Sequence, residues 1–491
     1  MPLRPYEQDQ IFLLPPSLNE WIREDHPARV FSEIIDSIDT ATFRESKEEG
    51  RPAYHPAMMI KTLLWGYATG VRSSRKIEEK LEQDVVFMWL AGLEKPDFRT
   101  LCLFRTNNKE ALEKIFTDVI IVAKTMGMAT LGLVALDGSK VRANSGIDTF
   151  KKLGDWKELL KEAKDEAEKI INEAESIDKE EDKIHGANRR GDELPKEIEK
   201  AQDRIKKIEA LIKKAHELGK EDESRVSLTD AEASFMHKGN TSIPAFNAQL
   251  AVTEEQLIVY ADVTPEPVDV NQTKKAVEGM EETVKEKPKI VVADTGYAGG
   301  ENFKYLEDNK IDGYIPSEDE RHIGSKKRQK AMGHLFAKEV FTYNTHKDKY
   351  TCPQGEILRP VARTQFKSKY SKREITTYRT KRETCAACPL REKCTTNIKL
   401  GRAITRDGYE EYRERMRAKI STAEGRAIYG KRKCLVEPVF GQIKIRSRFD
   451  QFLLRGLEKA KIEWKIAATA HNLLKITAAI MRKERMLPAL G

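Results

Sequence analysis

The chain has 491 residues, enough for about three domains of roughly 150 residues each, and its hydrophobic content of 39% supports sizeable buried cores. These values exclude a single small module. The formal net charge of +8 is unevenly distributed, since residues 321–491 contain 41 Lys and Arg against 16 Asp and Glu, whereas residues 1–320 contain 46 against 63. A basic C-terminal third favours a polyanionic partner such as nucleic acid or a membrane surface, and a merely charged soluble surface is the alternative.

The sequence contains no run of about eighteen apolar residues that could span a membrane. The longest apolar runs, Leu131–Leu136 and Ile466–Ala470, predict core segments. The start lacks the apolar stretch of a signal peptide, and six cysteines in a chain of this length do not form a disulfide scaffold. We therefore expect a soluble protein of a reducing cytoplasm, with no membrane partner.

Residues 1–125 predict a helical N-terminal domain. Apolar residues recur at helical spacing over residues 57–67 and 73–89, and Asp97 is a suitable N-cap for a helix that carries Arg99 and Arg105. A helix, a turn and a second helix bearing arginines form a geometry that enters the major groove of DNA. Arg99 and Arg105 are therefore candidate DNA-binding residues, and a helical scaffold or dimerisation domain is the alternative.

The chain changes character over residues 129–145. A short apolar run ends in Asp137-Gly138-Ser139, which predicts a buried strand that delivers Asp137 to its end, followed by a turn and a candidate second strand over residues 140–144.

Residues 151–226 are highly charged, with 41 charged residues among 76. Apolar residues recur at alternating steps of three and four from Ala163 to Ile177 and again from Ile198 to Ala215, which is typical of a heptad seam. The interruption at residues 185–191 favours an antiparallel helical hairpin. We interpret this segment as a structural or partner-facing insertion.

Residues 245–316 predict an α/β pattern. Two β-rich runs, 245–252 and 256–263, form a hairpin, and a helix is expected over 272–285. Lys289–Ala293 then predicts a second buried strand that ends at Asp294, followed by a helix over 301–309 and a strand over 313–316.

Asp137 and Asp294 are candidate metal ligands because of their positions. Each follows an apolar strand and precedes a turn that contains glycine. Two such carboxylates on adjacent strand ends would repel each other, and a divalent cation relieves this repulsion. The alternative is that each residue forms a turn or caps a helix.

Residues 321–400 predict a very basic, partly β insertion with four cysteines, namely Cys352, Cys385, Cys388 and Cys394. Two cysteines separated by two residues can chelate a metal ion through one turn, and a further pair completes a tetrahedral thiolate site. The spacing predicts structural Zn²⁺, with unligated or redox-active cysteines as the alternative.

The region after residue 401 returns to helix and contains a third candidate acid, Glu437. On a helix, Lys433, Glu437, Gly441 and Lys444 share one face, which places the acid between basic residues able to hold phosphates. Because proline disfavours helix in the residue before it, Pro438 predicts that a helix begins or kinks at Glu437.

Together these motifs resemble the DDE transposases of bacterial insertion sequences. The resemblance rests on Asp137 in Leu-Asp-Gly-Ser, Asp294 in Ala-Asp-Thr-Gly-Tyr, and the set Tyr429, Arg432, Glu437 and Lys444. Four residues separate Arg432 from Glu437 where the family has three, and Lys433 would restore the shorter spacing. The resemblance runs from about residue 50 to about residue 475, because residues 55–105 also resemble the helical domain that precedes such catalytic domains.

The resemblance implies an α/β fold with a ribonuclease H-like mixed sheet flanked by helices. The expected parts are an N-terminal helical domain (1–125), a catalytic domain (126–150, 227–320 and 401–485), a charged helical-hairpin insertion (151–226) and a basic cysteine-rich insertion (321–400).

The resemblance also implies the chemistry and the partners. Asp137, Asp294 and Glu437 would bind Mg²⁺ or Mn²⁺, Arg432 or Lys433 and Lys444 would hold a phosphate, and Tyr429 would contact DNA. The expected partners are double-stranded DNA, as inverted repeats and as target, and a second copy of the chain in a homodimer on DNA in the bacterial nucleoid. The alternatives are a domesticated DNA-binding protein and a ribonuclease H-like nuclease without strand transfer.

Overall fold

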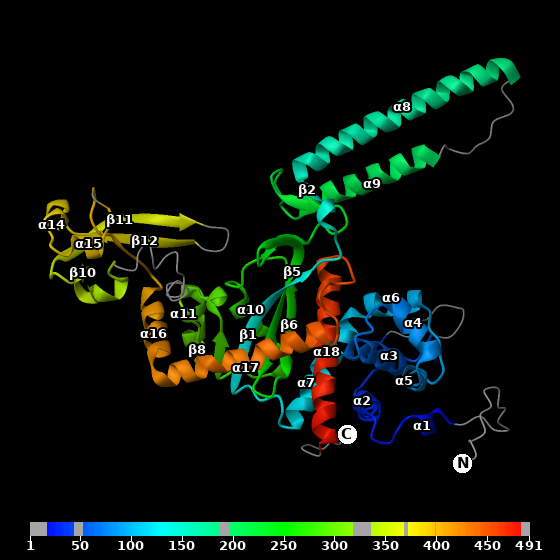
Figure 1. The fold of residues 1–491 in the computed structure, drawn as a ribbon, viewed down its shortest axis with the longest axis horizontal. Helices are drawn as coiled ribbons and strands as arrows, with labels where there is room; N and C mark the ends of the chain where they lie inside the picture. The colour runs from blue at the N-terminus through cyan, green and yellow to red at the C-terminus, as the bar shows by residue number, and fades with distance from the viewer. Residues whose placement is uncertain are drawn as a thin grey trace, which may run out of the picture.

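The computed structural model describes residues 17–43, 53–185, 196–317, 335–367, 372–397 and 399–482 (Figure 1). Most of the predicted turn at residues 185–191 and the start of the predicted cysteine-rich insertion lie outside these ranges. Within them, no helix is long and apolar enough to cross a membrane.

A six-stranded mixed sheet forms the centre of the fold, as the predicted α/β class requires. Its strands follow the order β4-β5-β1-β7-β8, and β6 also pairs with β5. The strands are β1 (Leu133–Arg142), β4 (Ser234–Lys238), β5 (Thr241–Thr253), β6 (Ile258–Thr264), β7 (Ile290–Ala293) and β8 (Asp312–Tyr314). β1 is antiparallel to β5 and parallel to β7, so the predicted hairpin and the second buried strand are both confirmed.

Five helices flank this sheet, namely α10 (Gln272–Val284), α11 (Gly300–Asp308), α16 (Glu410–Ser421), α17 (Ala423–Ile445) and α18 (Leu457–Met481). α17 contacts β5, β1, β7 and β8, whereas α18 contacts β6 (Figure 1). The fully buried Trp464 of α18 stacks on Phe440 of α17 and packs edge-on against Phe449. These aromatic contacts fix α17 and α18 on the sheet.

Seven helices form the N-terminal part, namely α1 (Leu18–Trp21), α2 (Pro27–Asp36), α3 (Pro56–Ala68), α4 (Ser74–Gln83), α5 (Val85–Leu90), α6 (Phe98–Asn107) and α7 (Lys109–Thr125). α2, α3 and α7 pack on α18 (Figure 1). A buried ion pair joins the N-terminal helices to α18, since Nη1 of Arg72, between α3 and α4, lies 3.1 Å from Oε1 of Glu463 in α18. Arg72 also donates to two backbone carbonyls, and Glu463 accepts from two backbone amides, so neither charge is left uncompensated.

Two long helices project from the rest of the molecule (Figure 1). They are α8 (Leu153–His185) and α9 (Lys196–Glu217), and the short strands β2 (Phe150–Lys152) and β3 (Arg225–Ser227) pair at their base. The seam residues Ala163, Ala167, Ile208 and Ala215 are buried, as the heptad pattern predicts.

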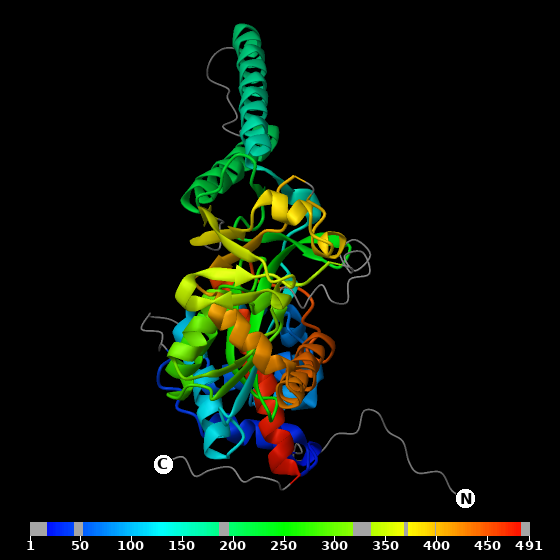
Figure 2. The same cartoon turned by 90° about the vertical axis from the view of Figure 1, so that its left-hand side faces the viewer.

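A second, five-stranded sheet lies beside α16, in the order β13-β12-β11-β10-β9 (Figures 1 and 2). The strands are β9 (Thr342–Asn344), β10 (Lys349–Thr351), β11 (Ile357–Lys367), β12 (Lys372–Arg379) and β13 (Ile404–Asp407), with the short helices α14 (Arg382–Ala386) and α15 (Arg391–Cys394). Its small core consists of Phe341, Tyr350, Leu358, Tyr378 and Ile404.

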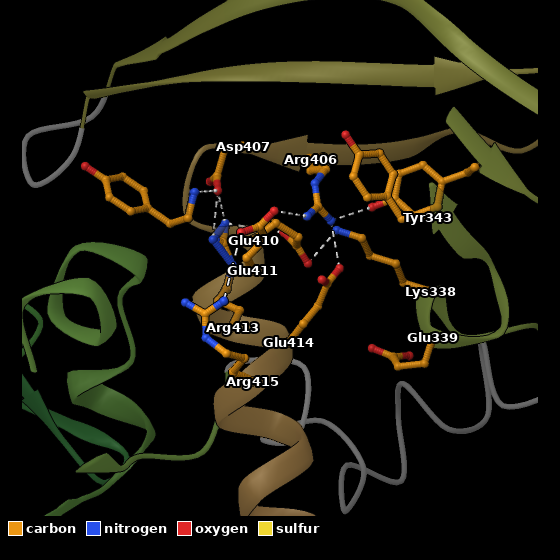
Figure 3. Close-up of polar contacts among 12 residues, drawn as sticks. Lys338, Glu339, Tyr343, Arg406, Asp407, Glu410, Glu411, Arg413, Glu414 and Arg415 are labelled. Carbon is orange, nitrogen blue, oxygen red and sulfur yellow. Dashed lines mark hydrogen bonds and ion pairs between the residues drawn. The ribbon is translucent and has the colours of Figure 1, made fainter. Parts of the chain in front are cut away.

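Charged contacts attach the second sheet to α16 (Figure 3). Arg406 of β13 donates to Glu414 at 2.7 Å and to the Tyr350 hydroxyl at 3.2 Å. Asp407 of β13 accepts from Arg413 at 2.9 Å. Because α16 leads directly into α17, these contacts also set the position of the second sheet relative to the central sheet.

The buried His471 of α18 predicts a pH dependence of stability. Its Nε2 donates to the Gln256 carbonyl at 3.0 Å, and burial lowers its pKa from 6.5 to about 4. The unfolded chain therefore binds a proton at a higher pH than the folded chain does, so stability falls as the pH drops from 6.5 towards 4. We expect His471→Gln to remove about 3 kcal/mol of this pH-dependent loss. Urea unfolding of both proteins across this range measures the difference, and parallel curves would contradict the assignment.

Candidate active site

Asp137 and Asp294 lie side by side on neighbouring strands. Leu136 of β1 pairs with Ala293 of β7, so the next residue along each strand is one of the two acids. β7 ends at Ala293, and Asp294 caps the short helix η2 (Thr295–Tyr297) by accepting from the Gly296 amide at 2.7 Å. The register of two parallel strands therefore brings together carboxylates that are far apart in the sequence.

The expected strand end at Asp137 is wrong. β1 continues through Asp137-Gly138-Ser139 to Arg142, because these residues keep pairing with β5 after β7 has ended. Asp137 lies within β1, at the point where its parallel neighbour stops. Burial raises the pKa of Asp137 to about 6, Arg432 opposes this shift, and the charge of Asp294 adds to it.

Helix α17 carries Glu437 to the same edge of the sheet. The Arg432 guanidinium lies between the acids, with Nη1 at 3.3 Å from Asp137 Oδ2 and Nη2 at 3.3 Å from Glu437 Oε1. The neighbouring Lys433 is exposed. Arg432, and not Lys433, is thus the basic residue that contacts the acids.

Of the two expectations at Glu437, a helix start or a kink, the start is wrong, because α17 runs from Ala423 to Ile445 through Pro438. Proline lacks the amide that would bond to the carbonyl four residues earlier. In this helix that carbonyl belongs to Cys434, and it accepts from the Gln256 side chain at 3.0 Å. A residue of the turn between β5 and β6 thus replaces the missing helical hydrogen bond.

The remaining residues of the α17 motif lie at different depths. Lys444 donates to Ser139 Oγ at 2.6 Å, and burial lowers its pKa. Tyr429 is partly buried against the main hydrophobic core. Lys444 and Arg432 therefore both lie against the strand that carries Asp137.

Asp269 is an acid of this region that the sequence did not single out. It lies in the loop between β6 and α10, and its Oδ1 accepts from Asn247 and from Gln249, each at 2.7 Å. Both amides are almost fully buried on β5. Asn247 and Gln249 are the only polar residues in the otherwise apolar run 243–252, and this pattern could have indicated a buried polar contact in the sequence.

The donor chemistry of the edge fits a divalent metal ion, since Mg²⁺ and Mn²⁺ prefer carboxylate oxygens. Asp137, Asp294 and Glu437 supply such oxygens from two strands and one helix. In the part of the chain that is described, however, no three His, Cys, Asp or Glu side chains are grouped so as to hold a metal ion. The Arg432 guanidinium occupies the space between two of the acids instead.

The four cysteines face a common cavity of about 30 Å³, which Leu358 and Arg402 also line. All four are free thiols. Burial raises the pKa of Cys394, Arg402 opposes the shift, and the three other thiols add to it. The second sheet thus brings together cysteines that the sequence separates, although they are not grouped at metal-binding distances.

The two candidate arginines of α6 have different surroundings. Arg99 is exposed, whereas Arg105 is 3% exposed and donates to the Tyr67 hydroxyl and to Ser74 Oγ. The guanidinium of Arg105 holds α6 against α3 and α4. Of these two arginines, only the exposed Arg99 therefore stays a candidate DNA contact.

The protein is thus an α/β protein in which acids of β1, of the end of β7 and of α17 lie close to basic residues of α17. Two family models match the chain, a transposase DDE domain over residues 351–477 and a transposase domain (DUF772) over residues 16–107. No curated protein sequence matches the chain significantly. The two matches support its assignment to the DDE-type transposases of insertion sequences, a family of nucleic-acid-processing enzymes that bind DNA and generally use a divalent metal ion.

The matches cover only some of the proposed site. The DDE domain match contains Glu437, the other α17 residues and the four cysteines, and the second match contains Arg99 and Arg105. Asp137 and Asp294 lie outside both matched ranges, so the geometry of β1 and β7 is the evidence for them.

The contrast between Arg99 and Arg105 gives a matched pair of variants. Arg105→Ala leaves buried hydroxyl groups without their partner and should lower the free energy of unfolding by about 3 kcal/mol. Arg99→Ala should change it by less than about 0.5 kcal/mol while weakening DNA binding by about tenfold. Urea unfolding and gel-shift titration measure the two effects. Unaltered DNA binding by Arg99→Ala would remove this residue from the interface.

Proposed function

We propose that the chain is a DNA transposase that cleaves the ends of an insertion sequence and joins the resulting 3′-OH to target DNA. Asp137, Asp294 and Glu437 are its proposed catalytic acids. The observation that carries the proposal is the convergence of these three acids, from β1, from the end of β7 and from α17, with Arg432 between them. A central strand paired antiparallel on one side and parallel on the other supports a ribonuclease H-like fold.

The reaction is an in-line displacement at phosphorus. In cleavage, water attacks the phosphorus and the 3′ oxygen leaves as a 3′-OH; in strand transfer, that 3′-OH attacks a target phosphodiester and displaces another 3′ oxygen. Two bound divalent ions would stabilise the attacking and leaving oxygens. The three carboxylates would hold these metal ions. Arg432 and Lys444 would hold the non-bridging phosphate oxygens, because Arg432 lies beside Asp137 and Lys444 lies beside Ser139 on the same strand.

Arg432 also stabilises the close approach of two of the acids in the protein without DNA. Arg432 compensates Asp137 and Glu437 while no phosphate is bound. The DNA backbone would compete for the guanidinium with these carboxylates. The binding of DNA and the binding of metal ions to Asp137 and Glu437 would therefore be coupled through the Arg432 side chain.

Two alternatives predict different products. A domesticated DNA-binding protein would bind ends without cutting, and the presence of all three acids speaks against it. A nuclease with the same fold would cleave without strand transfer. A plasmid integration assay separates the nuclease from the transposase.

The central test replaces each acid with its amide. Asp137→Asn, Asp294→Asn and Glu437→Gln should each lower Mg²⁺-dependent cleavage of the element ends by a factor on the order of a thousand or more, because each removes a charged oxygen ligand. Binding to the same DNA in a gel shift should persist. Glu254→Gln is the matched control, since Glu254 pairs with Lys431 on the surface. A variant that cleaves at the wild-type rate would remove its residue from the site.

We also propose that the four cysteines bind a structural Zn²⁺. Their common cavity and their thiol chemistry support this proposal, and the ion would have to draw the thiols closer together. Protein purified without chelators should contain about one equivalent of zinc. Cys385→Ser should lose it and Cys434→Ser should keep it, as measured by atomic emission. Less than about half an equivalent in the wild type would count against the site.

A further inference from the structure

We propose that the β11–β12 ribbon, made of residues 359–367 and 372–379, binds the phosphate backbone of double-stranded DNA beside the active site. This inference deepens the proposed function, on which it rests for the choice of partner. Its basis is the exposure of the ribbon, its uncompensated positive charge and the pairing of like charges across its two strands.

The ribbon extends beyond the rest of the second sheet (Figure 1). β10 pairs with β11 only at Ile357 and Leu358, and β13 pairs with β12 only over residues 375–378. Within the described residues, β11 therefore has one free edge over residues 359–367, and all nine of these residues are exposed. A two-stranded ribbon exposed in this way buries little apolar surface, so core packing does not explain its length.

The ribbon is strongly basic. It contains six Lys and Arg residues and one acid, Glu374, which accepts from the Gln365 side chain at 3.2 Å. Of the six cations, only Arg373 forms an ion pair among the described residues, with Asp407. The other five leave a local positive charge, to which a polyanion is the complementary partner.

Like charges lie directly opposite each other at both ends of the ribbon. Lys367 pairs with Lys372 at the distal end, and Arg359 pairs with Arg379 at the base. Like charges at directly opposite positions of two strands destabilise their pairing. The ribbon thus carries a repulsion that lowers the stability of the free protein, and phosphate groups between the cations would relieve it.

The distal half of the ribbon lies beside one of the proposed catalytic acids. Arg373 lies over the Phe366 ring, with its guanidinium carbon 5.1 Å from the ring centroid, and both residues line a cavity that Asp294 also lines. The ion pair between Arg373 and Asp407, at 3.2 Å, fixes this half of the ribbon on β13. Nine residues of a strand span about 30 Å, the length of about nine base pairs. DNA held by the ribbon would therefore extend from the acidic edge over almost one helical turn.

A structural alternative is that the lysines only protect the free edge of β11 from pairing with another chain, as charged side chains on edge strands often do. A charge of either sign supplies that protection, whereas binding to DNA requires a positive charge. Lys367→Glu/Lys372→Glu keeps a like-charge pair at the same two positions and therefore separates the two explanations.

The experiment measures binding of the full-length protein to a DNA duplex of random sequence, by fluorescence anisotropy at several salt concentrations. Lys367→Gln/Lys372→Gln should weaken binding by about tenfold or more. It should also reduce the slope of log K against log[salt] by about 1.8, since each phosphate contact contributes about 0.9. Lys367→Glu/Lys372→Glu should weaken binding further. Lys157→Gln/Lys164→Gln removes the same charge from α8, where each lysine is paired with an acid, and should bind as the wild type does.

The unfolding temperature is the control for folding, and Lys367→Gln/Lys372→Gln should keep or raise it because the substitutions remove a repulsion. If both ribbon variants bind DNA as the wild type does, the inference is overturned, while cleavage of element ends by the wild type would still support the proposed function. If the glutamine variant only self-associates and keeps its DNA affinity, the lysines protect an edge and the inference is likewise overturned. If the ribbon variants lose DNA binding as expected but the wild type cleaves no element end, the proposed cleavage is overturned and the ribbon assignment holds.

Discussion

The pairing of β1 with two different neighbours determines the geometry of the whole site. Over residues 133–136, β1 pairs with β7 on one side, and it pairs with β5 over a much longer stretch on the other. When β7 ends, β1 continues, so Asp137 lies beside Asp294 at an open edge. The helix α17 contacts β5, β1, β7 and β8 and presents Arg432 and Glu437 to that edge. A shift of one residue in the β1 register would turn Asp137 to the other face of the sheet.

The unequal charge distribution along the sequence becomes a local feature of the folded chain. Acids from the first part of the chain, Asp137, Asp269 and Asp294, lie next to cations from the second part, Arg432 and Lys444 of α17 and Arg373 of β12. The network around Arg406 and Asp407 attaches the second sheet at this position (Figure 3). Under the proposed function, the acids would attract a divalent cation and the surrounding cations would attract the phosphate backbone.

Sequence patterns predicted the elements better than the details of the site. The apolar strands, the β5–β6 hairpin and the heptad seam of α8 and α9 were predicted, because periodic burial leaves a direct signal. The continuation of β1 through Asp137 was not, because pairing with β5 overrides a local turn signature. The sequence left open whether a helix begins or kinks at Glu437, because Gln256, the donor that compensates for Pro438, lies far away in the sequence. Arg105 and Asp269 likewise depend on partners that only the folded chain brings near.

The position of bound metal tests the account most directly. Anomalous diffraction from crystals of the protein with an uncleaved element end and Mn²⁺ would locate each ion. The account predicts anomalous peaks in contact with the carboxylates of Asp137 and Asp294, with the Arg432 guanidinium moved from between Asp137 and Glu437 towards a DNA phosphate. Mn²⁺ peaks found only elsewhere, with Arg432 still bridging the two acids in the presence of DNA, would contradict it.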